Sequence, residues 1–141
     1  MDIDISGFTV TRCCIDYRFS LDLIRPEQVI RGQEHASLII DGHFEYVAGD
    51  TTTRHDPEQH PEELGPVLKL FRRTVEAASI AADGTLHIQF SDQMSIRVPS
   101  LFDYEAWELH HDDGRMLICM PGGNIAVWSA RSTRAEQSAN D

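Results

Sequence analysis

The sequence has little of what marks several common classes of protein. Its three cysteines, Cys13, Cys14 and Cys119, form no CxxC pair, which excludes a disulfide miniprotein and leaves them as small buried or half-buried apolar residues. It has no Gly-X-Y period and no sustained heptad repeat, so it is neither a collagen nor a coiled coil. It has no run of about 18 apolar residues and no signal peptide at its start, so we expect a cytosolic protein.

Positive charge is also scarce, because 12 basic residues face 23 acidic ones and the net charge is -11. Such a charge repels the phosphates of nucleic acids and the anionic surface of membranes, and it favours basic partners. We therefore expect binding neither to nucleic acid nor to membrane. A surplus of acid also keeps a small protein soluble, so the charge alone does not establish a partner.

The chain is long enough for one domain. Its 141 residues are 41% hydrophobic, and a chain of this length buries about two thirds of its surface on folding. Apolar patterning continues as far as Trp128, whereas residues 129–141 contain no large apolar side chain. We predict one domain over residues 1–128 and a disordered C-terminal tail over residues 129–141.

Alternation of apolar and polar residues predicts many strands. In one of them, Tyr17, Phe19, Leu21 and Leu23 share a face. Strands are predicted over residues 8–15, 17–23, 36–40, 43–47, 75–82, 86–90, 94–98, 104–110, 115–120 and 124–128. Tight hairpin turns are predicted at residues 41–42, 83–84, 91–93, 112–114 and 121–123.

One helix is predicted over residues 61–73, after a polar surface loop at residues 49–63. Its apolar residues at helical spacing are Leu64, Val67, Leu68 and Phe71. Acidic residues open it and Arg72 and Arg73 close it, as the helix dipole favours. The predicted fold class is α+β: an antiparallel β-meander, or curled sheet of several hairpins, packed against this helix.

Histidines lie near acids in two places, and imidazole and carboxylate groups together can bind a divalent metal ion. The candidate ligands are His55, His60, His110 and His111. Their spacing matches no metal-binding motif, and polar residues are expected at the 112–114 turn in any case. The sequence has no GxSxG elbow, phosphate loop or dinucleotide fingerprint. We therefore assign no catalytic residue and expect no cofactor.

Acidic and aromatic residues are combined in the segment from Asp103 to Asp113. Alternation places Glu105, Trp107 and Leu109 on one face of the predicted strand. Trp107 is then either a core residue or an aromatic anchor on a binding surface. Acids on this segment, with no base among them, are Asp103, Glu105, Glu108, Asp112 and Asp113.

Several motifs follow one another in a fixed order: Ile15-Asp-Tyr-Arg18, Ile40-Asp-Gly-His-Phe44, Asp83-Gly-Thr-Leu86 with Phe90-Ser-Asp92, Tyr104-Glu-Ala-Trp-Glu-Leu109 and Pro121-Gly-Gly-Asn-Ile-Ala-Val-Trp128. Over residues 8 to 128 this order resembles a family of small bacterial proteins, common in actinobacteria, that is classed as a domain of unknown function. The resemblance supports the fold and implies no activity. The size and acidity are also similar to those of immunity proteins in bacterial toxin systems, which bind a basic toxin enzyme.

Three hypotheses follow for the function. The first is a non-enzymatic interaction domain, immunity-protein-like, in which Trp107 and the acids at 103–113 bind a basic protein. The second is a small-ligand-binding or metal-dependent hydrolytic domain that uses the four histidines. The third is a structural module that forms a homodimer by pairing a sheet edge with itself.

Overall fold

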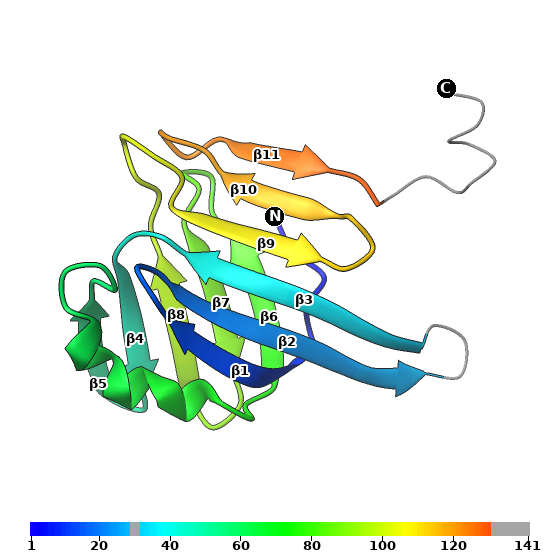
Figure 1. Cartoon of the computed structure of the whole chain (residues 1–141), viewed down its shortest axis with the longest axis horizontal. Helices are drawn as coiled ribbons and strands as arrows, with labels where there is room; N and C mark the ends of the chain where they lie inside the picture. The colour runs from blue at the N-terminus through cyan, green and yellow to red at the C-terminus, as the bar shows by residue number, and fades with distance from the viewer. Residues whose placement is uncertain (29–31, 131–141) are drawn as a thin grey trace.

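Two antiparallel β-sheets pack against each other in the computed structural model, which describes residues 1–28 and 32–130 (Figure 1). The six-stranded sheet has the order β1 (Thr9–Ile15), β2 (Phe19–Gln28), β3 (Gly32–Ile40), β9 (Trp107–His111), β10 (Met116–Cys119) and β11 (Ile125–Trp128). The five-stranded sheet has the order β5 (Thr51–His55), β4 (Phe44–Ala48), β8 (Met94–Val98), β7 (Leu86–Phe90) and β6 (Val75–Ile80). The prediction of an antiparallel, hairpin-rich β structure is confirmed.

The core lies between the sheets because alternate residues of the strands are apolar and point inward. In the six-stranded sheet, Leu21 pairs with Leu38, Leu38 pairs with Leu109, and all three are buried. In the five-stranded sheet, Ile96 on β8 pairs with Ile88 on β7, and both are buried. Directly opposed residues of an antiparallel pair share a face, so each sheet presents continuous apolar rows to the other.

The predicted α-helix is instead a 3₁₀ helix over Pro61–Leu70. Its buried residues, Leu64, Val67 and Leu70, are three apart, which is the period of a 3₁₀ helix. Leu68 and Phe71, expected to be buried at α-helical spacing, are instead exposed. The predicted fold class is therefore confirmed only in part: a helix forms at the predicted place, but it is a 3₁₀ helix and the fold is largely β. Among the described residues, no helix is long and apolar enough to cross a membrane.

The turn predicted at Asp41–Gly42 does not close a hairpin. β3 pairs with β2 and β9, whereas β4 pairs with β5 and β8, so the chain crosses from one sheet to the other at this point. Gly42 lies close to Leu101: a Cβ atom on it would lie 2.5 Å from Cδ1 of Leu101, so that side chain would have to shift. The backbone N–H of Asp41 donates to the carbonyl of Ala106 at 2.9 Å.

The remaining predictions concern four hairpin turns, a surface loop, the face of Tyr17 and the C-terminal tail. The turns at 83–84, 91–93, 112–114 and 121–123 do join paired antiparallel strands. Residues 51–55 form β5 rather than a loop, since their three threonines are β-branched and pair with β4. Tyr17 lies in the turn before β2 and is exposed, so it does not share the face of Phe19. The predicted tail lies outside the described residues from residue 131 onward.

Two turns meet at a point that admits only glycine. Gly84 lies in the β6–β7 turn and Gly123 in the β10–β11 turn, and a Cβ atom on Gly84 would lie 2.5 Å from the carbonyl oxygen of Gly123. A Cβ atom on Gly123 would collide with the carbonyl oxygen of Asp83. The indole N–H of Trp107 donates to the carbonyl of Gly84 at 3.0 Å, so a residue of the six-stranded sheet is tied to the same point.

We expect Gly123→Ala to destabilise the protein more than Gly122→Ala. Both glycines have positive φ, 99° and 87°, so alanine at either position costs about 1–2 kcal/mol of backbone strain. Gly122 has open space around its Cβ position, whereas alanine at 123 adds a steric clash of about 1–3 kcal/mol. Urea unfolding measures both losses. Equal losses for the two variants would contradict the close packing described here.

Candidate functional site

The five acids from Asp103 to Asp113 do not form one surface. Asp103 and Glu105 precede β9, whereas Asp112 and Asp113 follow it, and a five-residue strand is about 17 Å long. Glu108 lies within β9 and pairs with Ile39. The two ends of the strand therefore have to be considered separately.

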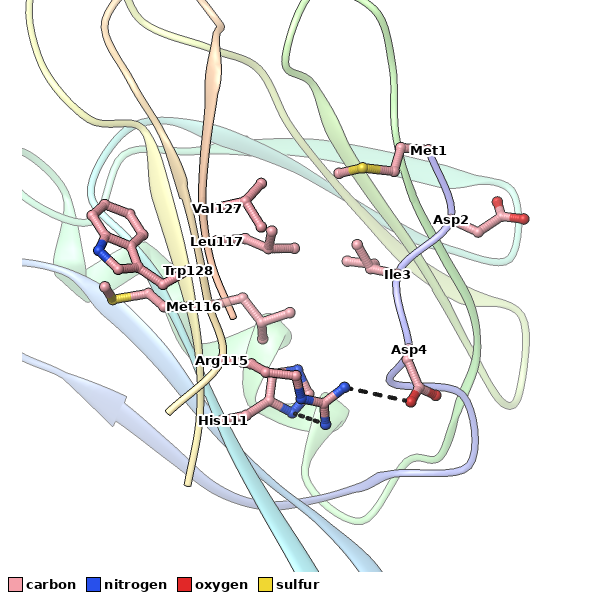
Figure 2. Close-up of a pocket in the computed structure, with 11 residues that line it drawn as sticks. Met1, Asp2, Ile3, Asp4, His111, Arg115, Met116, Leu117, Val127 and Trp128 are labelled. Carbon is pink, nitrogen blue, oxygen red and sulfur yellow. Dashed lines mark hydrogen bonds and ion pairs between the residues drawn. The ribbon is translucent and has the colours of Figure 1, made fainter. Parts of the chain in front are cut away.

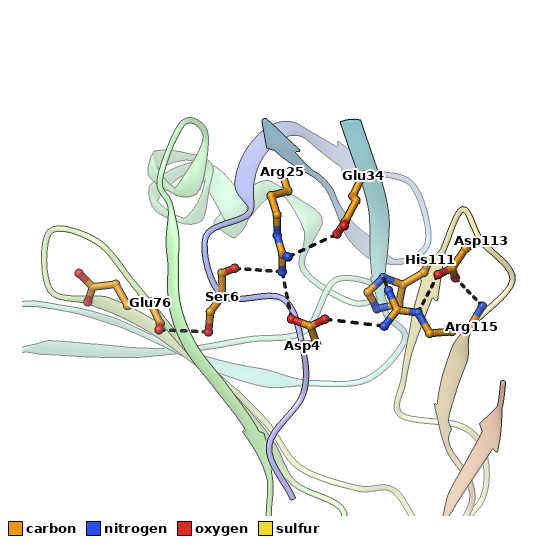
Figure 3. A network of polar contacts seen from close by, with 8 residues as sticks. All are labelled: Asp4, Ser6, Arg25, Glu34, Glu76, His111, Asp113 and Arg115. Carbon is orange, nitrogen blue, oxygen red and sulfur yellow. Dashed lines mark hydrogen bonds and ion pairs between the residues drawn. The ribbon is translucent and has the colours of Figure 1, made fainter. Parts of the chain in front are cut away.

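At the end that follows β9, two arginines pair with Asp113 and with acids of neighbouring segments (Figure 3). Nε of Arg115 lies 2.8 Å from Oδ2 of Asp113, and its Nη1 lies 3.8 Å from Oδ2 of Asp4. Arg25 lies 3.0 Å from Asp4 and 3.5 Å from Glu34, and it also donates to the carbonyl of Ser6. This polar cluster links the N-terminal segment to β2, to β3 and to the turn between β9 and β10.

Burial and packing mark the polar cluster as structural. Arg25 is only 16% exposed, and its guanidinium carbon lies 4.6 Å from the centre of the Phe8 ring. The hydrogen bond from Arg25 lowers the pKa of Asp4 below its usual range. His111 lies in the same cluster, 3.3 Å from Arg115, and its pKa is lowered by burial and by that arginine.

At the end that precedes β9, three loops meet around Asp41. Arg18, in the β1–β2 turn, lies 3.9 Å from Asp41 and 3.8 Å from Asp16. On the other side, the backbone N–H groups of Asp41 and Gly42 both donate to the carbonyl of Ala106. The loop that carries this carbonyl also packs on Gly42 through Leu101. Residues 15–18, 41–43 and 101–106 are therefore neighbours in space.

Acid is in excess at this end. The pKa of Asp41 is raised, first by burial and then by the charges of Glu108, Glu105 and Asp16, while Arg18 acts in the opposite direction. Glu108 lies 3.2 Å from His110 on the outer face of the sheet. An additional cation placed here would relieve the repulsion among the carboxylates.

Large aromatic side chains accompany these acids at the surface. Phe102 is 91% exposed, Tyr17 is 82% exposed and Tyr104 is 48% exposed. Exposed aromatic rings are typical of surfaces that bind other proteins. We call this region the acidic–aromatic end, and it consists of Asp16, Tyr17, Asp41, Phe102, Asp103, Tyr104, Glu105 and Glu108.

Trp107, one of the expected partner-binding residues, is not at the surface. It is fully buried, and its indole N–H donates to the carbonyl of Gly84, so it is a core residue and cannot contact a partner. Sequence reasoning missed Phe102 and Tyr17 as exposed aromatic residues. Both residues lie in short polar segments between strands, and an aromatic residue in such a segment could have indicated an exposed ring.

The four candidate metal ligands do not come together. His55 on β5 is buried, stacks on Phe44 at 5.5 Å between ring centres and lies 2.7 Å from Oγ1 of Thr53; burial lowers its pKa. His60 precedes the 3₁₀ helix and is exposed. His110 and His111 are consecutive in β9, so they point to opposite faces of the sheet.

A small group of possible ligands does exist near His60. His60, Glu62 and Glu63 have ligand atoms within 4.8 Å of one another, and this is the one such group among the described residues. All three side chains are exposed, and Nδ1 of His60 lies 3.3 Å from Glu62. Exposed acidic groups of this kind are common without a metal, so we assign no metal site.

The three cysteines behave as small apolar residues, as expected. All three are free; Cys119 is buried, and Cys13 and Cys14 are half-buried. Burial raises the pKa of the Cys13 thiol to about 11, so this thiol is protonated at neutral pH.

An apolar cleft with a cavity volume of about 200 Å³ separates the N-terminal segment from β9, β10 and β11 (Figure 2). Ile3 lines one side, and Leu117 and Val127 line the other. The polar cluster closes one end of this cleft through His111 and Arg115 (Figure 2).

Comparison with known proteins identifies one family. The chain matches a family described as "Family of unknown function (DUF6188)" over residues 1–129. No curated protein and no solved structure matches the chain. These comparisons supply no activity, so the function has to be argued from the surface of the molecule.

We expect Asp41→Asn to stabilise the protein at neutral pH by up to about 1 kcal/mol, the range for partly exposed charges. When folding raises the pKa of a carboxyl group, the folded protein loses stability as the pH rises from the pKa of that group in the unfolded chain, here 3.8, through its pKa in the folded protein. The advantage of asparagine should therefore vanish below pH 3.8. Thermal unfolding as a function of pH measures both effects.

The control is Asp83→Asn, which should have the opposite sign. The pKa of Asp83 is lowered by its hydrogen bond from the backbone N–H of Thr85. Neutralising Asp83 should therefore reduce stability at neutral pH. A loss of stability in Asp41→Asn at neutral pH would show that the pair with Arg18 outweighs burial and repulsion.

Proposed function

Because the chain belongs to a family of unknown function, DUF6188, no inherited activity guides its assignment, and we propose that it is a non-enzymatic interaction domain that binds a basic protein. The proposed binding surface is the acidic–aromatic end. The observation that carries the proposal is that Phe102 and Tyr17, both more than four-fifths exposed, lie on two of the loops that meet at Asp41, where acid is in excess.

Each part of this surface supplies a different contribution to binding. Aromatic rings provide large apolar contact areas with few rotatable bonds, and such residues dominate the binding energy of many interfaces. Carboxylates around Asp41 attract lysine and arginine side chains, which speeds association and fixes orientation. The raised pKa of Asp41 supports this role, since a cation from a partner would stabilise its ionised form.

A basic protein is the partner chemistry that fits best. The net charge of -11 disfavours nucleic acids and anionic membranes, and it adds a long-range attraction for any basic protein. Immunity proteins of similar size and acidity bind basic enzymes. A basic enzyme is therefore the first partner class that we propose to test.

The alternative of a metal-dependent hydrolytic domain receives less support. Its four histidines lie on different elements or on opposite faces of one strand within the described residues. Burial lowers the pKa of two of them, His55 and His111, and so favours the neutral imidazole, which can still bind a metal ion. Each of these two side chains instead contacts a different neighbour, Thr53 for His55 and Arg115 for His111. Among the described residues, no two of these four histidines belong to one group of possible metal ligands.

The partner can be identified by photo-cross-linking from position 102. A photoreactive phenylalanine in place of Phe102 is irradiated in an extract of the organism that encodes the chain, and the cross-linked protein is identified by mass spectrometry. The purified partner is then titrated against the wild-type chain and its variants. We expect neutralisation of Asp103 and Glu105 to weaken binding at least about fivefold, which is about 1 kcal/mol, and to flatten its salt dependence.

The matched control neutralises two exposed acids elsewhere, Asp50 and Glu58. This variant has the same net charge as the test variant, so only the position of the charge differs. Its binding should change less than about twofold, whereas truncation of Phe102 and Tyr104 to alanine should cost at least about tenfold. Equal losses in the two charge variants, or no effect of removing the aromatic rings, would rule out this surface.

A further inference from the structure

Most sheet edges of this protein are protected against pairing with another chain. The edge at β6 is covered by the N-terminal segment, where Ile3 donates to the carbonyl of Ala78 at 3.1 Å and Ile80 donates to that of Met1 at 2.7 Å. The edge at β1 is partly covered by residues 72–74, since Val10 donates to the carbonyl of Arg73 at 2.9 Å. The edge at β5 carries one charged residue, Arg54, which pairs with Glu45 of β4.

Within residues 1–28 and 32–130, no segment covers the outer edge of β11, and no charge interrupts it. Its sequence, Ile125-Ala-Val-Trp128, has no charge and no proline, and it pairs with β10 in regular register over four residue pairs. Val127 is 63% exposed and Trp128 is 47% exposed. Regular, apolar and uncharged edge strands readily accept another strand.

The backbone of β11 offers hydrogen-bonding groups to such a strand. Met120 donates to the carbonyl of Asn124 at 2.8 Å, and bonded pairs alternate along an antiparallel ladder. Ala126 and Trp128 are therefore the residues of β11 whose N–H and C=O groups bond to β10. Those of Ile125 and Val127 point away from β10, toward the open edge.

Side chains on both faces of β11 are apolar. Figure 2 shows Val127 beside Leu117 on the side of the cleft, facing the N-terminal segment. Trp128 lies beside Met116 on the opposite face, as expected from their direct pairing. A strand added at this edge would therefore gain apolar contacts above and below the sheet as well as backbone hydrogen bonds.

We propose that β11 pairs with β11 of a second copy of the chain, antiparallel about a two-fold axis. In one register that the outward-pointing groups allow, the two Val127 residues oppose each other at the mouth of the clefts. Trp128 then lies opposite Ala126 of the second copy on the outer face, because directly opposed residues share a face. The strand is thus self-complementary, with a large residue beside a small one and no charge to repel its own copy.

A second copy fits this edge better than the basic partner proposed for the acidic–aromatic end. An uncharged strand gives no advantage to lysine or arginine residues. Two copies that each carry a charge of -11 repel each other, so added salt should strengthen their association. Binding of a basic protein should instead weaken with salt, and this opposite dependence separates the two proposals.

Sedimentation velocity of the full chain over a dilution series, at low and high salt, tests the proposal. We expect a monomer–dimer equilibrium whose dissociation constant falls as salt is added. Val127→Pro removes an outward-pointing N–H, and Val127→Lys places a charge on the exposed edge. Each should raise the dissociation constant at least about tenfold, which corresponds to about 1.4 kcal/mol.

The matched control is Thr52→Lys, which places the same charge on an exposed residue of the β5 edge and should leave the dimer unchanged. Circular dichroism checks that all variants remain folded; if Val127→Pro unfolds, Val127→Lys decides. A wild-type chain that stays monomeric at every concentration and salt overturns the proposal. So does a dimer that Val127→Lys weakens no more than Thr52→Lys, or one that weakens as salt is added.

Discussion

The arrangement of this protein depends on the contact between the Gly84 and Gly123 backbones. One glycine belongs to the five-stranded sheet and the other to the six-stranded sheet, so their contact fixes how two hairpin turns lie against each other. The carbonyl of Gly84 also accepts the indole N–H of Trp107 and contacts the thiol of Cys119. The start of β9 and the end of β10 are thereby held at one place. The loop at 101–106 and the β10–β11 hairpin, which carry both proposed surfaces, extend from that place.

The distribution of charge matters more here than its total. Near one end of β9, Arg25 and Arg115 pair with Asp4 and Asp113, and those pairs hold the N-terminal segment to the six-stranded sheet. At the other end Arg18 faces several carboxylates, and the aromatic side chains nearby are exposed. β11 carries no charge at all. A protein with one strong net charge can therefore present an acidic surface and a neutral one, each suited to a different kind of contact.

Local patterns could be predicted from the sequence, whereas relations between distant segments could not. Strands such as β7 follow from alternation, and the Asp83–Gly84 hairpin follows from turn chemistry, because both depend on neighbouring residues. The role of Asp41–Gly42 could not be predicted, since it depends on β4 pairing with β8 rather than β3. Likewise, the acids of residues 103–113 are close in sequence, but β9 lies between them and places them at opposite ends of the strand. The burial of Trp107 depends on a turn more than twenty residues earlier in the chain.

The two tryptophans also give the protein a pair of intrinsic fluorescent reporters in opposite environments. Trp107 is fully enclosed between the sheets, so its emission reflects the integrity of the core. Trp128 is about half exposed on the outermost strand of the six-stranded sheet, so its emission and its accessibility to quenchers reflect what lies against β11. Core disruption and edge occupancy can therefore be distinguished optically in the unlabelled chain.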